Sequence, residues 1–234
     1  MKVPAIKRAL CGILGLLAGF GLASRALAEC NDAPQPGVDW SKCEKRRLIL
    51  SDANLSGGRF VETDFGRSDL SSARLGQADL QGASLDYSRL RGADLTRARL
   101  AKAHGYRANF TGAKLAGADL TKAEMSRANL GFADLSGANL SKADFGRTQL
   151  EGAKLERANL TTTDLGRANL AKAKLAGANF TGANLYLARI EGVDLSRVTG
   201  LTQPQIDVAC GDAVTRLPAG LRAPSGWPCK AAED

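Results

Sequence analysis

The stretch AGADLTKAEMSRANL, residues 116–130, shows the pattern that decides the fold. A large apolar residue recurs at every fifth position, an alanine lies two positions before it, and a polar residue separates the two. From Leu50 to Leu195, thirty consecutive positions keep this spacing without an insertion. Twenty-two of them are Leu and five are Phe, and the exceptions are Gly105, Met125 and Ile190. The repeating unit is therefore Ala, a polar residue, Leu and two further residues.

This period of five excludes both ordinary secondary structures. On an α-helix five residues advance by about 500°, so successive Leu side chains would lie roughly 140° apart and spread over every face. On a flat strand five is an odd step, and successive Leu side chains would point to opposite sides. The chain must therefore turn once per repeat and return each Leu to a common interior. Within a repeat, Ala and Leu share the inner side and the residue between them faces water.

The repeat tract, from residue 48 to 198, resembles the pentapeptide-repeat family. This resemblance implies an all-β fold, a right-handed quadrilateral β-helix with four repeats in each coil. Thirty repeats would then make seven and a half coils, a rod about 36 Å long at the strand spacing of a sheet. Its interior would be a narrow stack of Leu, so no cofactor is expected.

The N-terminus has the pattern of a secretory signal peptide. Lys2, Lys7 and Arg8 precede an apolar run from residue 9 to 23, and Ala26-Leu27-Ala28 provides the small residues of a cleavage site. We expect cleavage after Ala28 and a periplasmic or secreted protein. An uncleaved membrane anchor is the alternative, but the run is short for a full span. Removal of residues 1–28 lowers the formal charge from +8 to +4, which is too small an excess to indicate nucleic-acid binding.

Four cysteines remain after residues 1–28 are removed. An even number in an oxidising compartment is typical of disulfides, and three pairings are possible. The long repeat tract separates the cysteines into two local groups, which favours Cys30–Cys43 and Cys210–Cys229. Metal binding is the alternative, and no histidine lies near either group in the sequence.

The ends of a solenoid need protection because an open coil exposes apolar core and unpaired backbone. We expect residues 29–47 to form an N-terminal cap with Val38 and Trp40 as its lid, and residues 199–234 to form a C-terminal helix and strap. Thr202 and Gln205 have capping-box spacing for a helix that Gly211 would end. The four predicted regions are thus residues 1–28, 29–47, 48–198 and 199–234.

A coil of twenty residues would stack charged side chains into columns. Five arginines form one column with Tyr87 in its gap, three lysines form a second, and an acidic column lies between them. An acidic column would offset the repulsion between stacked like charges. The alternative is a surface that binds a polyanion, such as an acidic glycan, lipid headgroups or DNA. The columns are Arg67, Arg107, Arg127, Arg147 and Arg167; Lys102, Lys122 and Lys142; and Asp64, Glu124, Asp144 and Asp164.

The repeat is broken at AKAHGYRANF, residues 101–110, where Gly105 takes an inward slot. An empty slot of that size would cost about 2–5 kcal/mol. Met125 follows one coil later, and methionine adapts well to irregular gaps, so we predict that it fills the space. The alternative is a notch lined by Tyr87, His104, Tyr106 and Arg107, which could hold a sugar ring or an anionic group. Both interpretations stay open at this point.

Catalysis is not expected. The chain has one histidine, no glycine-rich phosphate loop before a helix and no Cys/His cluster with metal-ligand spacing. Its many carboxylates lie in repeat slots that face water. Members of the resembled family mimic DNA and bind a type II topoisomerase, but that activity needs a cytoplasmic location and an acidic surface. The export signal and the charge of +4 argue against it.

The leading interpretation is an exported, non-enzymatic scaffold that binds a protein or an envelope polymer. Polyanion binding through the Arg and Lys columns is the alternative, and neither a small-molecule substrate nor nucleic acid is expected. Phe132, Tyr186 and Leu187 are apolar residues at positions that face water. Tyr186 and Leu187 could pack beneath the C-terminal strap, or the group could form a homodimer contact.

Overall fold

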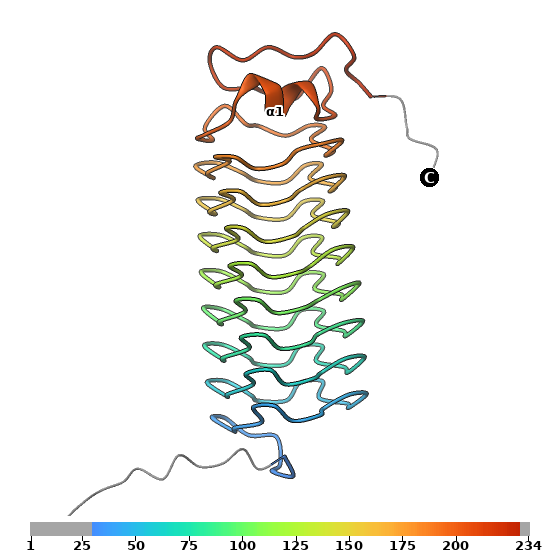
Figure 1. The fold of residues 1–234 in the computed structure, drawn as a ribbon, viewed down its shortest axis with the longest axis vertical. Helices are drawn as coiled ribbons and strands as arrows, with labels where there is room; N and C mark the ends of the chain where they lie inside the picture. Colours follow the sequence, from blue (N-terminus) through green and yellow to red (C-terminus); the bar gives the residue numbers. More distant parts are fainter. Residues whose placement is uncertain (1–29, 230–234) are drawn as a thin grey trace, which may run out of the picture.

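The computed structural model describes residues 30–229 of the chain. The expected signal peptide and its cleavage after Ala28 lie outside these residues. The described chain winds into a stack of similar coils that forms an upright rod (Figure 1). One short helix, α1 (Gln203–Asp207), lies at the C-terminal end of the stack.

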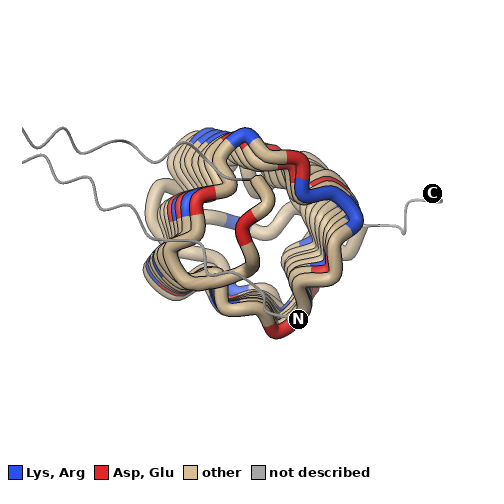
Figure 2. The backbone as a smooth tube through the Cα atoms, turned by 90° about the horizontal axis from the view of Figure 1, so that it is seen from below, with Lys and Arg blue, Asp and Glu red and all other residues tan. Residues whose placement is uncertain are grey.

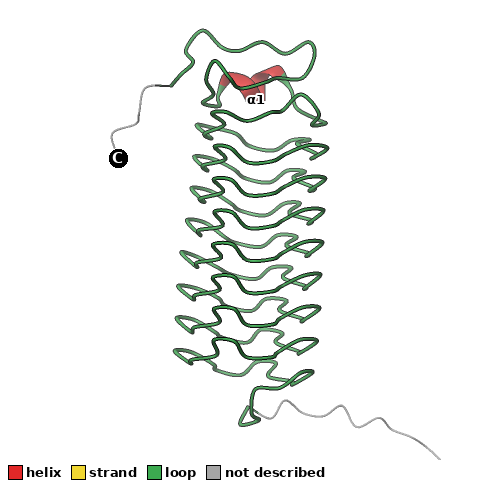
Figure 3. Cartoon of the chain, turned by 180° about the vertical axis from the view of Figure 1, so that it is seen from behind, coloured by secondary structure: helices red, strands yellow, loops and turns green. Residues whose placement is uncertain are grey.

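The coils are joined by a ladder of parallel bridges between residues twenty positions apart, as in Asn109 with Asn129. Most such residues are polar, and most lie just before an inward side chain. Around Phe110, the N–H of Asn109 donates to the coil before (Ser88 C=O, 2.9 Å) and the N–H of Phe110 to the coil after (Asn129 C=O, 2.7 Å). The twenty-residue offset places four repeats in one coil, as the resemblance implied. Each bridge is isolated, so Figure 3 draws the coils as loops.

The fifth-residue positions form the core. Leu120, Leu140 and Leu160 are almost completely buried, and so are the alanines two positions before them. Where Ser or Thr replaces such an alanine, its hydroxyl donates to a backbone carbonyl, as in Thr63 to Trp40 (2.6 Å) and Thr163 to Leu140 (2.8 Å). These bonds remove the cost of burying an unpaired hydroxyl. The wall therefore tolerates small polar residues without disturbing the stack.

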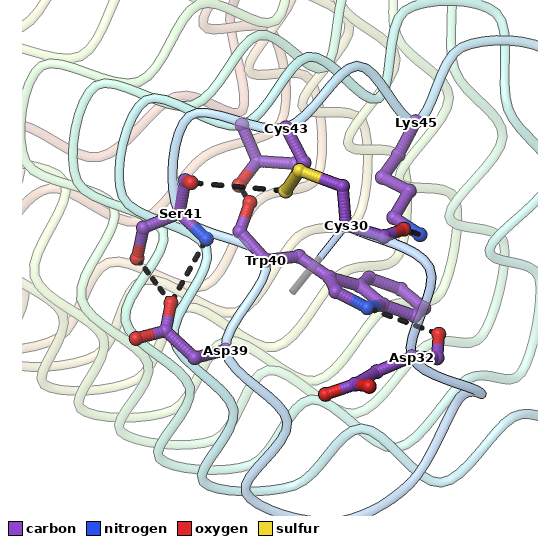
Figure 4. The surroundings of a disulfide bond; sticks show 8 residues. Cys30, Asp32, Asp39, Trp40, Ser41, Cys43 and Lys45 are labelled. Carbon is purple, nitrogen blue, oxygen red and sulfur yellow. Dashed lines mark hydrogen bonds between the residues drawn. A yellow bond between two sulfur atoms is a disulfide. The ribbon is translucent and has the colours of Figure 1, made fainter. Parts of the chain in front are cut away.

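The ladder begins at Asp39, which bridges to Arg59. Residues 39–47, which the sequence assigned to a separate cap, are therefore part of the first coil. Trp40 occupies an inward slot and is buried, and its indole N–H donates to the Asp32 carbonyl (3.2 Å). The disulfide Cys30–Cys43, with the two Cα atoms 5.5 Å apart, holds residues 30–32 against this coil (Figure 4).

Lys45 takes the next inward slot of the first coil, a position that holds Phe65 and Leu85 in the next two coils. Its ammonium lies 3.9 Å from the centre of the Trp40 ring and donates to the Cys30 carbonyl. Burial lowers the pKa of this ammonium, and nearby Asp32 opposes the shift. The apolar stack thus ends in the first coil at the charged Lys45 ammonium, which is partly stabilised by the Trp40 ring and the Cys30 carbonyl.

The C-terminal end is covered by α1 and the segment after it. Ile206 of α1 is buried, and the Gln205 amide donates to the Phe180 and Ala183 carbonyls (2.9 and 2.8 Å). The prediction that Gly211 ends this helix is wrong. The helix ends at Asp207 because the chain must return to the ladder at Cys210, which bridges to Arg189.

The strap, residues 215–229, is fixed on this end by a disulfide and by Trp227. Cys210 forms a disulfide with Cys229, with Cα atoms 5.3 Å apart, so both predicted disulfides are present. The Trp227 indole N–H donates to the Ala209 carbonyl (2.7 Å). Its ring lies against Gly211, where an added Cβ would approach ring carbons to 2.4 Å. Gly211 therefore makes room for Trp227. Within residues 30–229 no helix is both long and apolar enough to cross a membrane.

Candidate functional site: the arginine corner

Each repeat ends in a tight turn at a corner of the coil. At one such turn the N–H of Ala128 donates to the Met125 carbonyl (2.9 Å), and Arg127 has a φ of 60°. The same positive φ recurs at the second residue after most inward side chains. This backbone region favours glycine and costs other residues about 1–2 kcal/mol. The corners are therefore the positions where a side chain is most costly to place.

One of the four corners contains no glycine. The other three contain Gly82 and Gly182; Gly92, Gly112, Gly152 and Gly192; and Gly57, Gly117, Gly137 and Gly177. The exception, which we call the arginine corner, has φ values of 53–62° throughout. It gives up the residue that its turns favour and holds a long side chain in every coil. Its residues are Arg47, Arg67, Tyr87, Arg107, Arg127, Arg147, Arg167 and Leu187.

The arginines of this corner are exposed and free of carboxylates. On other faces of the rod some charges are paired, as in Arg89 with Asp69 (3.0 Å) and Arg99 with Asp79 (3.3 Å). Within residues 30–229, by contrast, no ion pair involves any of the five predicted arginines. The charges therefore remain available to a partner. The five are Arg67, Arg107, Arg127, Arg147 and Arg167, all exposed.

The neighbouring acidic column does not pair with them. Asp144 accepts from the Gly146 N–H (2.8 Å) and from the Ser126 hydroxyl. Asp164 accepts from the Gly166 N–H (2.8 Å) and from the Asn184 amide (2.9 Å). These carboxylates hold turns in shape. They can offset the repulsion between arginines only by electrostatic attraction at longer range, because they form no ion pair with them.

The lysine column lies on the corner that precedes this acidic column. Its three members have positive φ values of 58–61° and are exposed, and none forms an ion pair in the part of the chain that the structure describes. Viewed along the rod, basic residues of successive coils overlie one another (Figure 2). The structure thus assembles both predicted basic columns. The lysines are Lys102, Lys122 and Lys142.

The predicted aromatic cluster is only partly assembled. The Tyr87 and Tyr106 rings meet edge to face with centres 5.6 Å apart. The Arg67 guanidinium lies 5.6 Å from the Tyr87 ring centre, and that of Arg107 lies 5.5 Å from the Tyr106 ring centre. His104 belongs to a different contact, because its Nδ1 lies 3.1 Å from Glu124 Oε2. The tyrosines therefore continue the arginine corner as a stacked series.

The break at Gly105 is a packing exchange, as predicted. A Cβ added to Gly105 would lie 2.4 Å from Met125 Sδ and 3.3 Å from its Cε. Met125 is completely buried, so its side chain takes the space of the missing Leu. Gly105 therefore opens no notch to the surface.

Two features of the rod were not found from the sequence. One is the buried Lys45, which lies before the start of the thirty-repeat series. The other is a groove at the corner diagonally opposite the arginine corner, with Arg157 and Arg197 in its lining. The twenty-residue column arithmetic, extended to that corner, would have aligned these two arginines. Among the described residues no group of His, Cys, Asp or Glu could hold a metal ion.

Known proteins share this repeat. The family model described as pentapeptide repeats matches residues 49–86, 88–127, 123–161 and 163–199, in eight copies. HetL, a pentapeptide repeat protein involved in heterocyst differentiation regulation in the cyanobacterium Nostoc, is 30% identical; the match covers 79% of this chain and 91% of HetL, with a TM-score of 0.44.

Two further solved structures are similar. QnrB1, a plasmid-mediated fluoroquinolone resistance protein, is 18% identical over 80% of this chain and 93% of QnrB1, with a TM-score of 0.48. A pentapeptide repeat protein from the Arabidopsis thaliana thylakoid lumen is 28% identical over 60% of this chain and 83% of its own, with a TM-score of 0.31. No curated protein matches the sequence.

Proposed function

Since this chain belongs to the pentapeptide repeat family, whose members are right-handed quadrilateral β-helices, we propose that it is an exported, non-enzymatic scaffold of the bacterial envelope. Its arginine corner contacts an acidic surface on a protein partner. The observation that carries this proposal is the absence of glycine from that one corner.

Backbone strain supports a binding role for the corner. Glycine would relieve about 1 kcal/mol or more at each arginine, and glycine does occupy two or more turns at every other corner. The arginine guanidinium forms paired hydrogen bonds with carboxylates. The backbone beneath is fixed by hydrogen bonds to the coils on both sides, so the arginines start from a rigid frame. A partner need not order that frame on binding.

Export is supported by the sequence of residues 1–28 and by the two disulfides. Disulfides persist in oxidising compartments and are rare in the cytosol. The absence of catalysis is supported by the chemistry of the surface carboxylates, several of which accept hydrogen bonds from turn residues. In the proposed role the chain binds its partner and transforms no substrate.

The location is tested by fractionating the native cell and identifying the N-terminal residue of the recovered protein. The proposal predicts an envelope or secreted protein that begins at Glu29. Recovery from the cytoplasm with residues 1–28 intact would contradict it and would reopen topoisomerase binding.

A second candidate function is direct binding of a polyanion, such as an acidic glycan, lipid headgroups or DNA. The unpaired arginines and lysines favour it, since stacked cations suit a regularly charged polymer. Binding of this kind weakens steeply with salt, by about one unit of log-log slope for each charge contact. Replacing Arg107, Arg127 and Arg147 by Glu should abolish it. If that variant binds the acidic glycan, the lipid headgroups and DNA as the wild type does, this candidate is excluded.

A further inference from the structure

The corner diagonally opposite the arginine corner contains an open groove with a volume of about 660 Å³. The two corners are half a coil, or ten residues, apart in sequence. The groove spans several coils near the C-terminal end of the rod. Its lining includes Ser136, Glu156, Arg157, Ala176, Gly177 and Arg197.

The groove results from alternation of glycine and arginine along this corner. Gly137 and Gly177 leave the backbone bare on either side of Arg157. The Arg157 side chain leans across the next coil, with its Cγ 3.5 Å from where a Gly177 Cβ would lie. Arg197 follows one coil further on. The two arginines therefore bracket a stretch of flat backbone.

The charged groups of the groove are largely unsatisfied. Within the described chain, neither Arg157 nor Arg197 forms an ion pair or donates a side-chain hydrogen bond to another residue. Glu156 accepts only a long hydrogen bond from the Ser136 hydroxyl (3.4 Å). The groove thus combines two free guanidinium groups with a carboxylate that can still accept hydrogen bonds.

We propose that this groove binds a hexuronic acid, a sugar with one carboxylate and several hydroxyls. Arg157 and Arg197 bind the sugar carboxylate, since guanidinium groups match its geometry. Glu156 and Ser136 accept hydrogen bonds from ring hydroxyls, and the ring lies over Ala176, beside the Arg157 side chain that crosses Gly177. Glu156 repels a compact dianion such as hydrogen phosphate, which offers it one hydroxyl donor where a sugar ring offers several. A single anionic charge with several hydroxyl donors therefore fits the groove best.

The test measures binding of sodium D-glucuronate to the full mature chain by calorimetric titration, with glucose and inorganic phosphate as comparison ligands. We expect glucuronate to bind measurably more tightly than either. Arg157→Gly should weaken glucuronate binding by roughly tenfold or more, as expected for a lost charged hydrogen bond. Glycine suits the positive φ of 59° at Arg157, so this variant keeps the turn.

Arg97→Gly is the matched control. Arg97 lies on the same corner with a φ of 56°, and its Cγ lies 3.6 Å from where a Gly117 Cβ would be, but it is outside the groove. We expect this variant to bind glucuronate like the wild type. The proposal is overturned if wild type binds glucuronate no better than glucose, if Arg157→Gly has no effect, or if Arg97→Gly weakens binding as much. These results do not depend on the arginine corner, so this proposal and the scaffold function can fail separately.

Discussion

Removing the Met125 side chain should destabilise the rod more than a typical core truncation. Met125 fills its own slot and also the slot left by Gly105 one coil below, because its Sδ lies 2.4 Å from the position of a Gly105 Cβ. Met125→Ala therefore leaves two adjacent inward slots without large side chains. Such truncations cost about 2–5 kcal/mol, and the upper half of that range is expected here. Equilibrium denaturation with the disulfides intact measures this loss.

Gly105→Ala is the second arm of the same experiment. In the wild type the new methyl group overlaps Met125, and overpacking of this kind costs about 1–3 kcal/mol. In the Met125→Ala background the methyl group enters empty space, and Gly105 does not have the positive φ that would penalise it. The substitution should then stabilise the protein. A double-mutant cycle should give a coupling of about 1 kcal/mol or more. Effects of Gly105→Ala that agree within about 0.5 kcal/mol in both backgrounds would refute the packing exchange.

Three further predictions concern the charges and the ends of the rod. Hydrogen bonds from Ser71, together with Arg89, hold the pKa of Asp69 below its ordinary value of 3.8. The stabilisation that the charged Asp69 carboxylate provides is therefore present above pH 3.8 and lost as the pH falls through the lowered pKa. In Asp69→Asn the free energy of unfolding should fall less steeply toward acid pH. An equally steep fall in wild type and variant would contradict this. Since burial lowers the pKa of Lys45, its charged form is disfavoured, and Lys45→Met should raise the melting temperature at pH 7 by more than at alkaline pH; an equal gain at both would argue against a charge effect. Leu187 is half-buried, and its N–H donates to the carbonyl of Val208, which precedes the strap. Leu187→Asp should therefore lower the melting temperature without changing the sedimentation coefficient. A change from dimer to monomer would instead reveal a homodimer contact.

Most of the fold could be predicted from the five-residue period of the sequence. It excluded helix and strand, placed each Leu in the interior, and with four repeats in each coil it aligned the arginines that the structure stacks on one corner. The exchange of Gly105 and Met125 was also predictable, because both deviate from the repeat at positions one coil apart. These inferences succeed because the ladder repeats the same backbone geometry in every coil.

The ends could not be predicted in the same detail because the repeat does not govern them. Lys45 breaks the apolar pattern, so no inward slot was expected for it, and only its contacts with Trp40 and Cys30 explain it there. Gly211 was assigned to a helix end, but the Trp227 ring that requires it comes from a distant part of the chain. The absence of ion pairs at the arginines of the arginine corner could not be predicted either, since it depends on which groups donate hydrogen bonds to the neighbouring carboxylates.

The arginine corner is tested most directly by photocrosslinking in the native cell, with a photoreactive phenylalanine analogue placed at Tyr87. Phe132 is the matched control site, because it too is an exposed aromatic residue with a φ of 58° at a turn, on a different corner. Neither replacement changes the charge of the chain. We expect a discrete adduct from position 87 that disappears when Arg107, Arg127 and Arg147 are replaced by Gly, and no such adduct from position 132. An adduct that persists in the triple variant, or one that forms equally from position 132, would contradict it.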